Sequence, residues 1–99
     1  MNDCVNIRLF IAGETSRSQE ALANFRQIME RLPDRMIQLE VIDVLEQPER
    51  AEQESILATP TLVRGFPLPE RRIIGDLRDS ERVLRGLGLD SMVNKAEEE

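Results

Sequence analysis

The segment of residues 56–62 constrains the fold of this chain more than any other part of the sequence. It is apolar up to Ala58, breaks at Thr59-Pro60, and resumes as the β-favouring run of residues 61–63. A proline just before a strand removes no ladder hydrogen bond, and it pushes the preceding residue toward extended backbone. The segment therefore predicts a strand that begins at Thr61.

The residues before this segment predict a strand, a helix and a second strand. Residues 5–12 alternate with period two, so that Val5 and Leu9 share one face while Arg8 and Phe10 share the other. Ser16 with Gln19 fits a capping box, and an apolar stripe at helical spacing follows: Ala21, Leu22, Phe25, Ile28, Met29 and Leu32. Residues 37–45 end in an apolar run expected of an interior parallel strand covered on both faces.

The second half of the chain continues with a short helix, a hairpin and a last helix. Pro48 suits the first turn of a polar helix that extends to about Ile56. Strands are expected over residues 61–64 and 71–75, followed by a helix capped by Asp79. The order βαβ-αββα is an α/β layout, that of the thioredoxin fold, in one domain over residues 1–93. Residues 94–99 form an acidic tail that is expected to be disordered.

Composition excludes several classes of function. The 99 residues include 13 basic and 19 acidic side chains, giving a net charge of −6, which argues against nonspecific nucleic-acid binding. No apolar run has membrane-spanning length, and the first residues do not resemble a signal peptide. The single cysteine, Cys4, cannot form an intramolecular disulfide, so the sequence indicates a cytoplasmic protein.

The sequence indicates a binding module and not an enzyme. Thioredoxin-like enzymes place a nucleophilic cysteine in the loop after the first strand, and that loop, residues 13–18, contains none. The chain also has no histidine, the commonest general base. Ser16 and Ser18 are interpreted as helix-cap residues, and Asp43 and Asp76 as strand-end carboxylates that bind the next turn. No cofactor and no metal site are predicted.

Five ordered blocks resemble the KaiB family of circadian clock proteins over roughly residues 7–89. They are residues 10–13, 41–45, 56–62, 71–77 and 83–84. The resemblance implies a thioredoxin-like fold without the CxxC motif, and a non-enzymatic role in binding KaiC, a hexameric ring ATPase. It also implies a possible fold-switching C-terminal half with an alternative tetrameric ground state, so a homotetramer or homodimer is possible. A similar domain forms the sensory end of the clock-output kinase SasA.

The same resemblance suggests which residues contact partners. Arg71 and Arg72 match the family, while Ser55 and Glu40 stand where members often carry lysine. Because the Glu40 position belongs to the edge where KaiA docks, the reversed charge argues against KaiA as a partner. The leading hypothesis is binding to a KaiC-type ATPase in a clock or simpler timer. The alternative is a thioredoxin-like interaction domain in stress response or two-component signalling without rhythmic output.

Three residues are candidates for a structural or switching role. Pro60 is expected to follow a cis peptide bond in the thioredoxin-like state. Gly86 and Gly88 are expected to end the last helix, and clock-type members usually carry an acidic residue at the place of Gly88. Residues 83–89 fit a glycine-ended helix, but their apolar positions could equally alternate as a strand.

Overall fold

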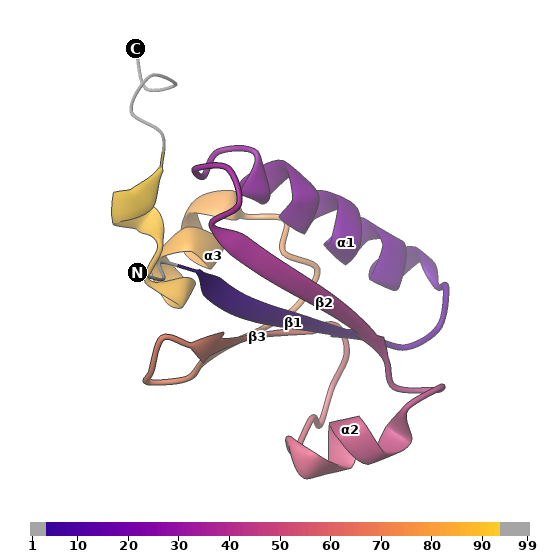
Figure 1. Cartoon of the computed structure of the whole chain (residues 1–99). Helices are drawn as coiled ribbons and strands as arrows, with labels where there is room; N and C mark the ends of the chain where they lie inside the picture. The colour runs from indigo at the N-terminus through magenta and orange to yellow at the C-terminus, as the bar shows by residue number, and fades with distance from the viewer. Residues whose placement is uncertain (1–3, 94–99) are drawn as a thin grey trace.

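The computed structural model describes residues 4–93, which form one four-stranded sheet with helices on both faces (Figure 1). In chain order the elements are β1 (Val5–Ile11), α1 (Ser16–Met29), β2 (Ile37–Asp43), α2 (Pro48–Gln53), β3 (Thr61–Phe66), β4 (Arg71–Ile74), α3 (Ser80–Leu87) and the 3-10 turn η1 (Asp90–Met92). The strand order is β2-β1-β3-β4; β1 is parallel to β2 and antiparallel to β3, and β3 is antiparallel to β4.

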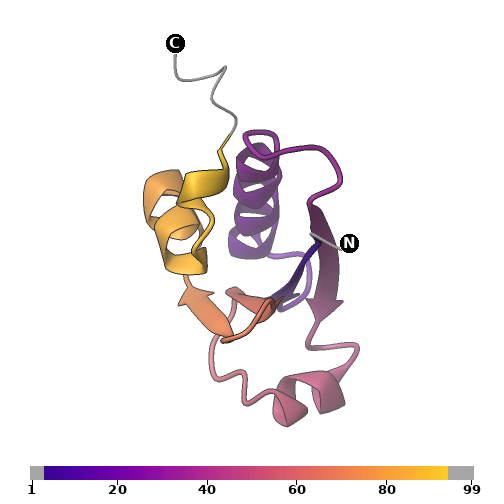
Figure 2. The same ribbon diagram turned by 60° about the vertical axis from the view of Figure 1, so that its left-hand side comes forward.

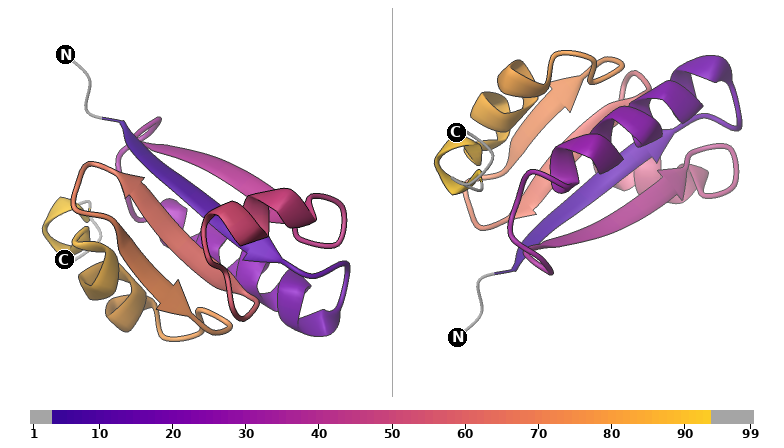
Figure 3. Two further views of the ribbon diagram at one scale, coloured as in Figure 1. Left: turned by 90° about the horizontal axis from the view of Figure 1, so that it is seen from below. Right: turned by 90° about the horizontal axis from the view of Figure 1, so that it is seen from above.

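The two faces of the sheet are covered unequally. Helices α1 and α3 lie side by side on one face, and α2 lies alone on the other (Figures 2 and 3). The main core lies beneath α1 and α3 and is almost wholly aliphatic apart from Phe25. The alternation predicted for β1 is confirmed, because Ile7 and Leu9 belong to this core while Phe10 belongs to a small cluster on the α2 side.

The start of α1 differs from the predicted capping box. Thr15, not Ser16, is the N-cap, because Thr15 has extended backbone and its Oγ1 accepts a hydrogen bond from the backbone N–H of Ser18 at 3.2 Å. The Ser18 side chain is buried, and its Oγ accepts hydrogen bonds from Thr15 Oγ1 and from the backbone N–H of Ala12. Ser18 is thus a structural residue of the β1–α1 turn.

The prediction that the second strand is an interior strand is wrong. β2 ends at Asp43 and lies at the edge of the sheet, where it pairs with β1. Gln38, Glu40 and Val41 are exposed, whereas Ile42 is fully buried. The apolar run of residues 41–45 continues past the end of the strand into a turn. Its hydrophobicity therefore does not indicate a strand that is buried on both faces, and Leu45 in this turn is 71% exposed.

Other boundaries shift by a few residues. α2 ends at Gln53 instead of near Ile56, because Ser55 has a positive φ of 56° that stops the helix. β3 extends to Phe66, and β4 ends one residue before Gly75. The Thr59–Pro60 peptide bond is cis, which confirms that expectation. The predicted tail, residues 94–99, lies outside the described residues.

Of the two alternatives for residues 83–89, this structure has the glycine-ended helix, which is helical up to Leu87. Asp79 is confirmed as the N-cap, and Gly88 ends α3 in the left-handed conformation with φ 73°. Gly86 does not end the helix but lies inside it. A Cβ at Gly86 would lie 2.8 Å from Ile73 Cδ1, so the missing side chain lets α3 pack closely on β4.

Candidate partner-binding site

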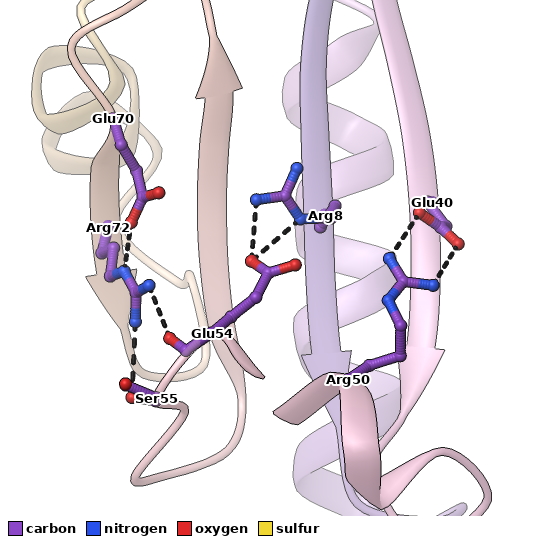
Figure 4. Close-up of polar contacts among 7 residues, drawn as sticks. All are labelled: Arg8, Glu40, Arg50, Glu54, Ser55, Glu70 and Arg72. Atoms are coloured by element: carbon purple, nitrogen blue, oxygen red, sulfur yellow. Dashed lines mark hydrogen bonds and ion pairs between the residues drawn. The ribbon is translucent and has the colours of Figure 1, made fainter. Parts of the chain in front are cut away.

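The α2 face is defined here by five charged residues that connect α2 to the sheet: Arg8, Glu40, Arg50, Glu54 and Arg72 (Figure 4). α2 itself contains no buried residue. Apolar support comes from the small cluster of Phe10, Ile42 and Val63, with Val44 and Ile56 packed against it. α2 is therefore held largely by polar contacts, each of which reaches a different strand.

The contact to β1 is the most protected of these. Arg8 donates from Nε and Nη2 to Glu54 Oε1, at 3.1 and 2.7 Å, and the two side chains are 23% and 21% exposed. Gly65 makes room for the guanidinium, because a Cβ there would lie 2.6 Å from Arg8 Nη1. Gly65 is also the extra residue of a bulge where the β1–β3 register shifts.

The contact to β2 is a two-pronged ion pair at the surface. Arg50 donates from both terminal nitrogens to the two oxygens of Glu40, at 3.0 and 3.1 Å. These hydrogen bonds, helped by the charges of Arg50 and Arg8 and opposed by slight desolvation, lower the pKa of Glu40 below its ordinary value. Both carboxylate oxygens of Glu40 are therefore already hydrogen-bonded to Arg50 of the same chain.

The contact to β4 fixes the chain just after α2. Arg72 donates to the backbone carbonyls of Glu54 and Ser55, at 2.6 and 3.4 Å, and forms an ion pair with Glu70 at 2.6 Å. Arg72 thus satisfies carbonyl groups at the end of α2 and holds the positive-φ turn at Ser55. Directly after this turn, Leu57 is 94% exposed.

The predicted partner-binding residues divide between the two faces. Ser55 and Arg72 are in contact, because Arg72 donates to the Ser55 carbonyl. Glu40 lies on the same face of the sheet, where it pairs with Arg50 of α2. Arg71 does not join them, because neighbouring residues of a strand point to opposite faces. Arg71 pairs in register with Arg64, and both guanidinium groups lie near Gly88, at the end of α3.

Sequence reasoning missed Arg8, Arg50 and Glu54, and it did not single out Arg64. A signal existed for Arg8: it shares a strand face with Phe10, so its charge needs a partner or water. Arg64 carries a similar signal, because it shares a face with the fully buried Leu62.

The strand-end carboxylates behave as the sequence analysis interpreted them. Asp43 Oδ1 accepts hydrogen bonds from the backbone N–H groups of Gly13 and Leu45, both at 2.9 Å. Asp76 Oδ1 accepts from the N–H of Arg78 at 3.0 Å. Within residues 4–93, no group of three or more His, Cys, Asp or Glu side chains is placed to hold a metal ion. None of the helices in this range has the length and hydropathy needed to span a bilayer.

Comparison with known proteins identifies relatives of this chain. The KaiB domain model matches residues 8–89. The chain is 48% identical over 83 residues to the circadian clock protein KaiB3 of Synechocystis sp., covering 84% of this chain and 81% of that protein. It is 52% identical over 83 residues to the circadian clock oscillator protein KaiB of Prochlorococcus marinus, covering 84% and 79%.

Solved structures with lower identity show the same fold. The N-terminal domain of SasA from Synechococcus elongatus superimposes with a TM-score of 0.73 at 23% identity, covering 95% of this chain and 92% of that domain. Mitochondrial thioredoxin 3 from Saccharomyces cerevisiae gives a TM-score of 0.69 at 22% identity, covering 89% and 79%. The fold is thus thioredoxin-like, and by its sequence the chain belongs to the KaiB family of circadian clock proteins.

Proposed function

We propose that this chain is a non-enzymatic regulator that binds a KaiC-type ring ATPase. The observation that carries the proposal is the identity of about half of 83 aligned residues with proteins named as circadian clock oscillators. The loop of residues 13–18 agrees with a binding role, because it has no cysteine at the position where thiol–disulfide exchange would need a thiolate.

The α2 face supplies the surface that fits this role. Two exposed leucines stand on either side of α2 in the sequence, Leu45 before it and Leu57 after it, and they are 71% and 94% exposed. Exposed apolar side chains beside ordered polar groups are typical of protein interfaces, where an apolar centre is surrounded by a polar rim. We place Leu57 at the centre of the contact and Ser55 and Glu40 at its margin.

Arg72 contributes to this surface by holding it in shape. Its two carbonyl contacts fix the turn that presents Leu57, so its removal loosens the turn before any partner arrives. A partner then has to order the turn on binding, at a cost of about 0.5–1.5 kcal/mol for each immobilised side chain. Arg71 points away from the α2 face and contributes less to the same complex.

The test is the affinity for the KaiC-type ATPase encoded in the same genome. Wild type, Leu57→Ala, Arg72→Ala and Arg71→Ala are compared with Arg17→Ala, which removes the same charge from the exposed surface of α1. We expect saturable binding, which is at least about tenfold weaker for Leu57→Ala because Leu57 lies at the centre of the contact, and several-fold weaker for Arg72→Ala. Arg17→Ala retains wild-type affinity.

Two results would contradict the proposal. If the folded wild-type chain does not bind, the KaiC-type ATPase is not its partner. The alternative, an interaction domain in another signalling pathway, would then be favoured. Binding that is unchanged in both Leu57→Ala and Arg72→Ala would overturn the α2 face as the contact surface. Equilibrium unfolding of each variant separates loss of a contact from loss of the fold.

A further inference from the structure

Arg64 on β3 is a buried cation on the face of the sheet opposite α2. It is 6% exposed, and it donates from Nη1 to the carbonyl of Leu87 at 2.6 Å and from Nη2 to the carbonyl of Pro69 at 2.7 Å. Its Nε is buried without a hydrogen-bond partner in the described part of the chain. Within residues 4–93 no carboxylate forms an ion pair with it, which is unusual because buried charges are normally paired.

A second guanidinium group approaches the same place. Arg71 lies opposite Arg64 in the β3–β4 register and is exposed. A Cβ at Gly88 would lie 3.0 Å from Arg64 Nη1 and 3.9 Å from both Cζ and Nε of Arg71. The partly exposed backbone of Gly88 therefore lies beside both guanidinium groups, and Gly88 places no side chain between them and the solvent.

The local charge favours an anion at this position. Burial, and then the positive charge of Arg71, lower the pKa of Arg64. The carbonyl groups at the end of α3 offset only part of the two charges. Each guanidinium has five N–H donors, and only two of the five on Arg64 are used in the contacts above.

We propose that Arg64 and Arg71 form a binding site beside Gly88 for an oxyanion, a carboxylate or a phosphate group. Guanidinium groups bind both through charge-assisted hydrogen bonds. The site lies on the opposite side of the sheet from the α2 face, so it does not depend on the proposed ATPase contact. An oxyanion held there bridges β3, β4 and the end of α3, and it stabilises the folded chain.

The test titrates the full chain with inorganic phosphate and, separately, with acetate, against chloride at equal ionic strength. We expect saturable shifts of the Gly88 amide in NMR spectra and a rise in thermal midpoint with at least one of the two anions. At ten times the dissociation constant the folded-to-unfolded ratio rises about elevenfold, which corresponds to a midpoint shift of roughly 6–11 °C for a domain of this size. The anion that binds more tightly identifies the preferred group.

Matched variants locate the site without removing Arg64. Arg71→Ala weakens binding, whereas Arg17→Ala, with the same change in net charge, does not. Gly88→Asp places a carboxylate beside the two guanidinium groups, while Gly88→Asn supplies the same shape without charge; both residues tolerate the left-handed conformation better than most. We expect Gly88→Asp to be more stable than Gly88→Asn and to lose the response to the external anion.

Three results would overturn the inference. One is the absence of saturable shifts with either anion. The second is equal binding by Arg71→Ala and Arg17→Ala. The third is an anion response in Gly88→Asp as large as that in Gly88→Asn.

Discussion

The most protected polar contact at the end of α2, between Arg8 and Glu54, predicts an energetic coupling between Gly65 and Arg8. Gly65→Ala adds a methyl group 2.6 Å from Arg8 Nη1, closer than the two atoms can approach, and 3.1 Å from Nη2. The φ of Gly65 lies outside the left-handed region, so alanine causes no backbone strain. The guanidinium therefore has to move, and it leaves Glu54 Oε1, to which it donates at 2.7 and 3.1 Å.

Two opposing terms set the size of the effect. Replacing glycine by alanine at a compatible position stabilises by about 0.4–1 kcal/mol, because the unfolded chain loses freedom. The side chains of Arg8 and Glu54 are about one-fifth exposed, so this ion pair is intermediate between a surface pair and a buried pair. Surface pairs contribute about 0.2–1 kcal/mol, and breaking a buried pair costs about 3–5 kcal/mol. We take its loss as about 1–2 kcal/mol. Gly65→Ala then destabilises wild type by up to about 1.5 kcal/mol.

In an Arg8→Ala background the clash is absent, so the same substitution stabilises by about 0.4–1 kcal/mol. The double-mutant cycle therefore gives a coupling energy of about 1–2 kcal/mol. Urea unfolding of wild type, both single variants and the double variant measures it. Additivity to within about 0.3–0.5 kcal/mol would refute the steric reasoning.

Three further outcomes are expected. Thr15→Ala costs about 1 kcal/mol of unfolding free energy by losing the α1 cap, whereas Ser16→Ala changes it by less than about 0.5 kcal/mol; equal urea midpoints would contradict this assignment. The Glu40–Arg50 pair stabilises the folded chain fully above the unfolded-state pKa of Glu40, and this stabilisation is lost as the pH falls through the lower folded-state pKa. An NMR titration of Arg50→Gln is expected to show the pKa of Glu40 closer to its ordinary value. In an insulin-reduction assay the wild type shows no turnover; activity that disappears in Cys4→Ser would contradict a non-enzymatic role.

Sequence patterns predicted the half of the fold that depends on regular periodicity. The alternation in β1 assigned Leu9 and Phe10 to opposite faces, and the stripe containing Phe25 identified the buried side of α1. These patterns predict which side chains are buried because each helix or strand repeats one backbone geometry along its length, with a fixed period of side-chain directions. The cap at Asp79 was also predictable, since capping involves residues only three positions apart.

Contacts between distant residues could not be predicted in this way. The apolar end of β2 suggested an interior strand, but sheet order is set by how the whole chain packs, and β2 lies at an edge. The role of Gly65 depends on Arg8, 57 positions earlier in the sequence, and that of Gly86 depends on Ile73. Likewise, the family resemblance grouped Arg71 and Arg72 as partner-binding candidates, whereas alternation in β4 separates them onto two faces.

Hydrogen exchange of the full chain, measured with and without the KaiC-type ATPase, tests the central claim most directly. If the α2 face is the contact surface, backbone amides from Glu54 to Leu57 and in α2 gain protection in the complex, while exposed amides at the start of α1 near Arg17 do not. Protection confined to α1 and α3, with residues 48–57 unchanged, would show that the partner binds the opposite face and would contradict the account.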